Sequence, residues 1–550
     1  MKVKNKLILS ALLLLLIASC DKDDDNIILT NDILFADMLE ILGGSTAIDA
    51  ATSIQYAVTG IANEFQEDPE PVNELTANYS YDLIYMLDAR KTKQSWSIQT
   101  DYAYESDFSF VEVIDGTKGT SEGTTGFFSQ YFAGFGVQGD PMFSTKLAAR
   151  QKTNMMSSPL AMVKMISART TITGSTVGII DIGFNASSLG FGSATPDLQL
   201  VIDIDTKLPV KAQVLENDPL YGDVVYQVEY SEWTTVNGIQ YPGKLTHIFD
   251  GHTIRTETLS NIEINPTFDP SDLTVSTSDW TYDADEAKSG HLSSQFHYRM
   301  LMVSFAEDFP VEFTEATDPA ATPSATVPND VNVYRVSGDF QSHYTYAFKV
   351  NGELVIYDSP LNNRRTSAAL NKIRADFSTD PIKYVVNSHN HFDHIGGIRG
   401  SLAEGGDLVV GAGSKTAFES ILQNPYTVLS NPIEGLTVNV VGVTDELVVG
   451  TGDDQIILYI LPTEHAETDD FIMIYKPSTQ TIYLADVYNP GFGFAWEGLG
   501  TANQQRSILL AKDIVNFVDS KGITVANSYA VHGFVLQDNL YSNIVDMSNM

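Results

Sequence analysis

Three histidines and one aspartate lie close together in one short segment, His389-Asn390-His391-Phe392-Asp393-His394. Imidazole and carboxylate groups are ligands that zinc accepts in proteins, and iron and manganese accept them as well. His389 and His391 are two residues apart and can approach one ion together. The loop can turn Asp393 and His394 toward a second ion. Because the chain has only 10 histidines in 550 residues, this cluster predicts a metal centre.

A short buried strand must position this cluster. Residues 382–386 are an apolar run with β-branched side chains, which is typical of a strand in the interior of a sheet. The histidines follow directly, and Gly396-Gly397 comes just after them. The metal-capable side chains therefore leave the end of a strand and enter a glycine-bearing loop.

The cluster and four other positions resemble the signature of the metallo-β-lactamase-fold hydrolases. That family has five motifs in fixed order, and the chain has a candidate for each: Asp358 after a strand at 354–357, the cluster at 389–394, His465 after a strand ending at Leu461, Asp486 after a strand at 482–485, and His532 after a strand at 529–531. Five histidines follow residue 343, and these motifs use all of them. The resemblance covers residues 331–550 and implies a four-layer αββα sandwich with its ligands at one edge of two packed sheets.

The resemblance also implies a role for each position. The expected metal ligands are His389, His391 and His465 for one ion, Asp393, His394 and His532 for a second ion, and Asp486 between the two. The ions are expected to be two Zn2+, with iron or manganese as alternatives. Asp393 and Asp486 are the expected catalytic residues, acting on a hydroxide that bridges the metals. Asp358 is expected to fix a ligand loop without binding metal, or else to cap the turn before Pro360.

The acid at position 486 narrows the expected reaction. Family members that destroy β-lactams most efficiently usually have cysteine or serine there, whereas Asp486 resembles the glyoxalase II, lactonase and phosphodiesterase branches. The segment after His465, residues 466–470, departs from the Thr and Gly of many members, which leaves the shape of that loop open. The resemblance therefore implies a metal-dependent hydrolase that acts on an ester, lactone, thioester or related bond of a small-molecule substrate.

Two other hypotheses fit the same residues. Sulfur dioxygenases of the same fold share the histidine-rich motif, so a mononuclear iron enzyme is one alternative. The other is a non-catalytic lipoprotein that binds a lipid or a protein partner through its N-terminal part. The intact acid at position 486 favours an enzyme over this last hypothesis.

The N-terminus predicts a membrane anchor. Three lysines precede an apolar core at residues 7–17, which is too short to span a membrane. The small residues before Cys20, the sole cysteine, resemble a bacterial lipobox, so residues 1–20 are expected to be a lipoprotein signal peptide with lipidation of Cys20. Residues 21–26 form an acidic tether. We expect a protein anchored in the bacterial cell envelope at the outer membrane, facing the periplasm or the cell surface.

Residues 27–275 predict a mostly antiparallel β domain behind one leading helix. Apolar residues at helical spacing indicate a helix over 31–42 that ends at Gly43-Gly44. Asn-Gly at 237–238 and Asp-Gly at 250–251 indicate hairpins. The pattern is similar to the LolA-like half-barrel of outer-membrane lipoproteins. Its concave face would hold an acyl chain, which would make the ligand lipophilic, or the domain is packed and binds nothing.

Composition and the region between the two domains complete the expectations. Residues 276–330 are interpreted as a linker, because 318–328 is rich in Pro, Ala and Thr without hydrophobic periodicity. The net charge of −38 lacks the basic footprint of a nucleic-acid-binding protein. His247 and His252 have no acidic residues at ligand spacing and are interpreted as structural.

Overall fold

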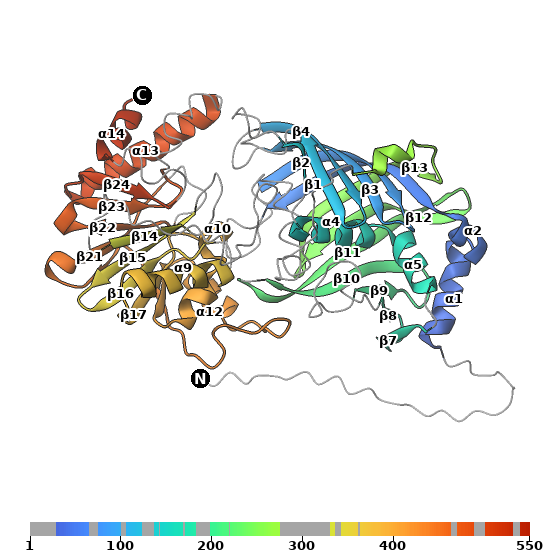
Figure 1. Ribbon diagram of the computed structural model, residues 1–550, viewed down its shortest axis with the longest axis horizontal. Helices are drawn as coiled ribbons and strands as arrows, with labels where there is room; N and C mark the ends of the chain where they lie inside the picture. Colours follow the sequence, from blue (N-terminus) through green and yellow to red (C-terminus); the bar gives the residue numbers. More distant parts are fainter. Residues whose placement is uncertain are drawn as a thin grey trace, which may run out of the picture.

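Figure 1 shows the computed structural model of the chain. The structure describes residues 29–64, 75–100, 106–123, 137–141, 144–168, 171–182, 198–218, 220–275, 331–335, 343–360, 363–463, 470–488, 501–531 and 540–550. The predicted signal peptide with Cys20, the acidic tether and the linker at 276–330 lie outside these ranges. In the part of the chain that the structure does describe, no helix has the length and apolar composition that a membrane span requires.

The N-terminal part is one sheet of 13 strands with helices packed against it. Its helices are α1 (Asn31–Leu42), α2 (Ser45–Ala50), α4 (Ser144–Met156) and α5 (Pro159–Ser167), with the short 3-10 helix η2 (Pro270–Leu273). Its strands are β1 (Ser53–Glu64), β2 (Leu75–Met86), β3 (Lys91–Thr100), β4 (Ser106–Asp115), β5 (Lys118–Gly123), β6 (Val137–Pro141), β7 (Thr173–Thr176), β8 (Ile179–Asp181), β9 (Gln199–Ile202), β10 (Pro209–Asp218), β11 (Gly222–Val236), β12 (Ile239–Phe249) and β13 (His252–Ile264).

The sheet is antiparallel, as the sequence predicts. Its strand order is β6-β5-β4-β3-β2-β1-β13-β12-β11-β10-β9-β8-β7, so the first and last long strands pair in the middle. Asn237-Gly238 and Asp250-Gly251 form the predicted hairpin turns, with positive φ at all four residues. The leading helix begins and ends at the predicted residues, and Gly43 ends it with φ 129°.

Helices α4 and α5 correct the expectation that the rest of this part is made of strands. Residues of α4 contact strands that lie far apart in the sheet order. Arg150 Nε lies 2.7 Å from Glu112 Oε2 of β4, and Lys152 pairs with Glu216 of β10. Six other strands separate β4 from β10. The sheet must therefore curve around α4, which gives the predicted half-barrel its shape (Figure 1).

His247 belongs to a buried ionic network on the side of the sheet that faces α4. Its Nε2 lies 3.3 Å from Glu257 Oε2, and Arg255 lies directly opposite it on the neighbouring strand. Glu257 also accepts a hydrogen bond of 2.8 Å from the Tyr79 hydroxyl. The Tyr226 hydroxyl lies 2.8 Å from His247 Nδ1. Tyr230, on the same face of β11, donates to the Met156 carbonyl of α4 at 2.5 Å. The sequence pattern did not indicate Glu257, because its carboxylate comes from the neighbouring strand β13.

Acid is expected to destabilise the half-barrel between pH 6.5 and 4. Burial, reinforced by the charge of Arg255, lowers the pKa of His247 from 6.5 to about 4. The unfolded chain therefore binds a proton in this window that the folded chain does not, so stability falls as the pH falls. The shift corresponds to about 3 kcal/mol in the free energy of unfolding. Urea unfolding of the full chain at several pH values measures it.

The control for this prediction is a second histidine of the same sheet. His247→Gln should flatten the dependence of stability on pH between 6.5 and 4, whereas His252→Gln, at an exposed position, should keep the wild-type slope. Equal slopes in all three proteins would show that His247 does not carry the effect.

The C-terminal part contains two sheets. The six-stranded sheet has the order β14 (Val331–Arg335), β15 (Tyr344–Val350), β16 (Glu353–Tyr357), β17 (Ile382–Val386), β18 (Asp407–Gly411) and β19 (Val440–Val443). The five-stranded sheet has the order β20 (Glu446–Val449), β21 (Ile456–Ile460), β22 (Ile472–Lys476), β23 (Thr481–Leu484) and β24 (Asn527–Ala530). The helices are α9 (Asn363–Asp376), α10 (Phe392–Ile395), α11 (Ile398–Ala403), α12 (Lys415–Ile421), α13 (Thr501–Lys521) and α14 (Tyr541–Ser548), with the 3-10 helices η3 (Gly452–Asp454) and η4 (Pro477–Thr479).

These elements form the predicted αββα sandwich. Apolar residues of both sheets share one core, in which the rings of Phe348 and Tyr483 meet edge to face at 4.8 Å. A second apolar cluster joins the six-stranded sheet to α9, α11 and α12. On the outer side of the other sheet, Phe517 of α13 packs on Tyr459 at 5.5 Å.

Candidate metal centre

The predicted motifs lie at the carboxyl ends of neighbouring strands. Strands β16, β17 and β18 are parallel, so their carboxyl ends meet at one edge of the six-stranded sheet. Asp358 follows β16, and Ser388 and His389 follow β17. Asp486 follows β23 of the other sheet. The ligand candidates therefore come from both sheets and meet where the two sheets end.

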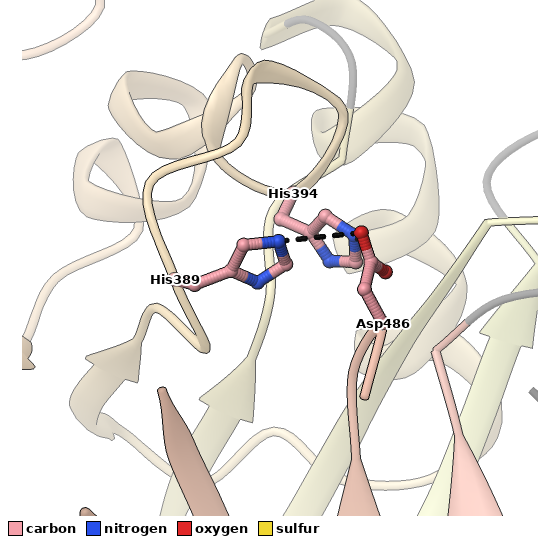
Figure 2. Close-up of side chains that lie close together, drawn as sticks. All are labelled: His389, His394 and Asp486. Carbon is pink, nitrogen blue, oxygen red and sulfur yellow. Dashed lines mark ion pairs between the residues drawn. The ribbon is translucent and has the colours of Figure 1, made fainter. Parts of the chain in front are cut away.

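Ring nitrogens of histidines lie close to both oxygens of the Asp486 carboxylate. Its Oδ2 is 3.3 Å from His389 Nε2 and 3.3 Å from His391 Nδ1. Its Oδ1 is 2.8 Å from His394 Nε2. Figure 2 shows His389 and His394 pointing at this carboxylate from the segment that leads from β17 into α10. One aspartate thus faces two separate sets of ring nitrogens, although it comes at least 92 positions after them in the sequence.

Asp358 organises the far sides of two of these rings. It is fully buried, and its Oδ2 lies 2.7 Å from His394 Nδ1 and accepts a hydrogen bond of 2.8 Å from the Ser388 hydroxyl. Its Oδ1 accepts the Ser388 amide at 2.7 Å. Because a carboxylate only accepts, His394 must carry its proton on Nδ1, which leaves the Nε2 lone pair free to face Asp486.

Ser388 fixes the position of the ring proton in His389 as well. Its hydroxyl lies 2.9 Å from His389 Nδ1. Since that hydroxyl donates its only proton to Asp358, it can only accept from His389, which places the His389 proton on Nδ1 as well. One buried carboxylate therefore fixes the tautomer of two candidate ligands, one directly and one through Ser388. Sequence analysis missed Ser388, and its place between β17 and the first histidine was the available signal.

Ser388→Ala is expected to weaken zinc binding about tenfold, at the low end of the effects known for residues that orient metal ligands. The variant removes the acceptor that fixes the His389 proton and leaves His389 itself in place. Competition with a coloured chelator measures the affinity. Ser378→Ala, which removes a similar hydroxyl contact with Asp380 before β17 begins, is the matched control. An unchanged affinity in Ser388→Ala would contradict this role.

His389 has the properties of a metal ligand. Burial and the neighbouring His391 and His394 hold its pKa well below the ordinary value, so the ring is neutral at pH 7. Among the described residues, its buried Nε2 has no hydrogen-bond partner. The ring stacks on Phe471 with 4.3 Å between centroids. Phe471 was also missed by sequence analysis, because it comes from the strand after the third motif.

The donor set fits a divalent metal. The ligand atoms of His389, His394 and Asp486 all lie within 4.8 Å of one another, and His391 Nδ1 faces the same carboxylate. Neutral imidazole and carboxylate are the donors that zinc prefers among nitrogen and oxygen ligands. A buried lone pair at His389 Nε2 without a proton to meet is the observation that a bound cation would explain.

The side chains of three predicted ligands lie outside the part that the structure describes. His465 and His532 lie outside the described residues, and Asp393 belongs to α10 without a described side chain. For His465 and His532, residues nearby in the sequence are described. Leu461 donates its amide to the Phe471 carbonyl at 2.8 Å, and these two residues lie before and after His465 in the sequence. Val531 donates to the Leu484 carbonyl at 2.9 Å, next to the strand end that carries Asp486.

Comparison with known proteins agrees with this architecture. Residues 338–502 match the family model of the metallo-beta-lactamase superfamily, so the chain has a domain of that superfamily in its C-terminal part. A metallo-beta-lactamase from Pontibacter korlensis matches with 14% identity over 41% of this chain and 98% of its own, at a TM-score of 0.31. TMB-1 matches with 15% identity over 40% of this chain and 93% of its own, at a TM-score of 0.29. No curated protein matches the sequence.

Proposed function

From the metallo-beta-lactamase superfamily domain at residues 338–502, we propose that the protein is a dinuclear zinc-dependent hydrolase. It acts on an ester, lactone, thioester or related bond of a small molecule. The observation that carries the proposal is the position of Asp486, whose two oxygens face His389 and His391 on one side and His394 on the other. A carboxylate in that position has an oxygen for each of two ions.

We assign the seven proposed ligands as the resemblance to the family implies. One ion has His389, His391 and His465, the other has Asp393, His394 and His532, and both have Asp486. Bound divalent ions would supply a water of lowered pKa and polarise the bond under attack. The chain contributes the rest. It keeps His389 neutral by burial, fixes two ring tautomers through Asp358 and Ser388, and holds Asp486 where it faces both sets of rings.

The aspartate at position 486 supports the glyoxalase II, lactonase or phosphodiesterase type of chemistry over that of efficient β-lactam hydrolysis. A bridging carboxylate brings two oxygens to the metals and adds one negative charge. A lipophilic substrate would agree with a location at the membrane. Helix α4 packs on the half-barrel through two ion pairs, Arg150 with Glu112 and Lys152 with Glu216, and through Met155 and Met156 in the apolar core. This favours the interpretation of that region as a packed domain.

We also propose that the protein is anchored at the outer membrane through a lipid on Cys20. The basic start, the short apolar core and the small residues before the sole cysteine support this. Cys20→Ala is expected to release the protein from the membrane fraction of the producing bacterium. Continued attachment of that variant would contradict a lipid anchor at this residue.

Metal content is the experiment that tests the hydrolase proposal. The chain from residue 26 onward, purified without added metal, is expected to hold two equivalents of zinc, and His391→Ala is expected to lose zinc together with turnover in an ester, lactone and phosphodiester screen. His252→Ala, at an exposed site of the half-barrel, is the control. Retained activity in His391→Ala would contradict the proposal. One equivalent of iron with oxygen consumption would favour a sulfur-dioxygenase-like enzyme, and binding of an acyl ligand without any metal would favour a lipid-binding lipoprotein.

A further inference from the structure

The two parts of the chain meet at the turn between β10 and β11 (Figure 1). We call residues 218 and 220–223 the hairpin tip, and residues 421–431 the docking loop. Asp223 of the tip accepts hydrogen bonds from the Thr427 amide at 2.7 Å, the Thr427 hydroxyl at 2.6 Å and the Val428 amide at 3.1 Å. These bonds lower the pKa of Asp223 against the opposing effect of its partial burial. One side chain of the N-terminal part thus fixes the backbone of a C-terminal loop.

The hairpin tip is fitted closely to the docking loop. Tyr221 accepts a hydrogen bond of 2.9 Å from the Asn424 side chain through its carbonyl. Gly222 has φ +84°, and a Cβ there would lie 2.4 Å from the Pro425 carbonyl oxygen. Leu220 is 2% exposed and belongs to the apolar cluster between the six-stranded sheet and its helices. The tip therefore supplies part of the core of the C-terminal domain.

The docking loop also holds a buried cation. Arg399 of α11 is fully buried and donates to the Ile421 carbonyl at 2.7 Å, with its guanidinium 5.0 Å from the centre of the Tyr426 ring. Burial lowers the pKa of Arg399, and Tyr426 and Asp218 act in the opposite direction. Asp218 is buried too, and its Oδ1 accepts the Leu220 amide at 2.8 Å. A buried charge is costly without such an opposite charge near it.

Helix α11 connects Arg399 to the metal centre. The hydroxyl of Ser401, two residues further along the helix, lies 2.6 Å from the Ser359 hydroxyl. Ser359 donates its amide to the His394 carbonyl at 2.8 Å and follows Asp358, which lies 2.7 Å from His394 Nδ1. A shift of α11 would therefore move the residues that orient His394.

We propose that the hairpin tip is a positioning element of the metal centre, which holds the docking loop and Arg399 so that α11 keeps His394 in place. The half-barrel then contributes to metal binding without supplying a ligand. This inference rests on the proposed metal site. It requires that the zinc affinity of the folded protein depend on contacts made by the N-terminal part.

Substitution of Asp223 in the full chain from residue 26 onward tests the inference. Asp223→Ala removes three acceptor contacts with the docking loop. Asp203→Ala is the matched control, because Asp203 accepts a threonine amide at 2.7 Å and the same threonine's hydroxyl at 2.9 Å, but within its own turn before β10. Zinc affinity is measured by chelator competition, and hydrogen exchange is measured at the amides of residues 397–403. We expect Asp223→Ala to bind zinc about tenfold more weakly, with faster exchange at these amides, and Asp203→Ala to match the wild type.

Asp218→Asn is the second variant, and it serves if Asp223→Ala does not fold. It keeps the Oδ1 acceptor for the tip's own amides and removes the carboxylate charge that acts on Arg399, and it too is expected to weaken zinc binding. Folded variants with wild-type zinc affinity and wild-type exchange at 397–403 would overturn the inference while leaving the proposed hydrolase intact. A wild-type protein that binds no zinc would instead refute the proposed function, and unchanged exchange in both variants would then refute the inference on its own.

Discussion

Asp486→Asn is expected to lower zinc affinity by more than about 100-fold and to reduce turnover to background. Substitutions of residues that only orient a ligand cost about 10–100-fold, and Asp486 faces three histidine rings itself. The amide keeps the size of the side chain and replaces one acceptor oxygen with a donor. An NH2 group would turn protons toward the ring nitrogens that the metals need. Metal analysis after dialysis and chelator competition measure the loss.

The control for this substitution is an aspartate of the same domain at the opposite end of the sheet. Asp454 accepts the Asn351 amide at 3.1 Å in the turn before β16, and Asp454→Asn should leave zinc binding unchanged. If Asp486→Asn retains both ions, Asp486 does not bridge them. If it retains one, the histidines on a single oxygen of Asp486 are enough to hold an ion.

Local sequence patterns were enough to predict the elements that hold the site. The apolar β-branched run at 382–386 is a strand at those residues, because a short run of that kind is stable only when neighbours cover both of its faces. Asn-Gly and Asp-Gly pairs fixed the hairpins because few other residues accept positive φ at both turn positions. In both cases the information lies within about ten residues of sequence.

Helix α4 could not be predicted in that way. Its sequence carries three basic residues, among them Arg150 and Lys152, and two amides, and such a composition normally indicates a solvated segment. Arg150 and Lys152 are buried, because Glu112 and Glu216 meet them from strands on either side of the helix. Charges of this kind are stable only after the sheet has closed around them. No pattern along the chain records that closure.

In the candidate site too, some residues can be recognised from the sequence and others only from the folded structure. The spacing of His389, His391 and His394 predicts a metal site directly, because the three rings come from one short segment. Ser388 and Phe471 act through contacts with these rings that depend on how two sheets pack. The Ser414 hydroxyl, just before α12, donates to Asp470 at 2.8 Å. Side-chain partners from separate strands require the folded structure.

Asp358 variants are expected to have the second largest effect. Asp358→Asn should weaken zinc binding by about 10–100-fold, because an amide has one acceptor oxygen where Asp358 uses two, for Ser388 and for His394. Asp358→Ala should be worse and should also unfold more easily. It leaves buried donors unpaired, at about 1–3 kcal/mol for each, and it puts alanine at φ 64°, a conformation that Asn and Asp tolerate better. Chelator competition and thermal unfolding measure the two effects separately.

The comparison between the two variants separates orientation of the ligands from stability of the loop. If Asp358 only stabilises the turn before Pro360, Asp358→Asn should restore both the melting temperature and the zinc affinity, because asparagine adopts the same φ and caps turns equally well. If Asp358 fixes the His394 and His389 tautomers, as the distances indicate, Asp358→Asn should restore much of the melting temperature and little of the zinc affinity. An amide oxygen at the Oδ1 position keeps the Ser388 amide but turns the NH2 group toward the Ser388 hydroxyl and His394 Nδ1. The opposite orientation keeps those two contacts but turns the NH2 group toward the Ser388 amide, so neither orientation replaces the carboxylate. A variant with full zinc affinity would therefore assign Asp358 to the turn and leave the orientation of both rings to the metals themselves.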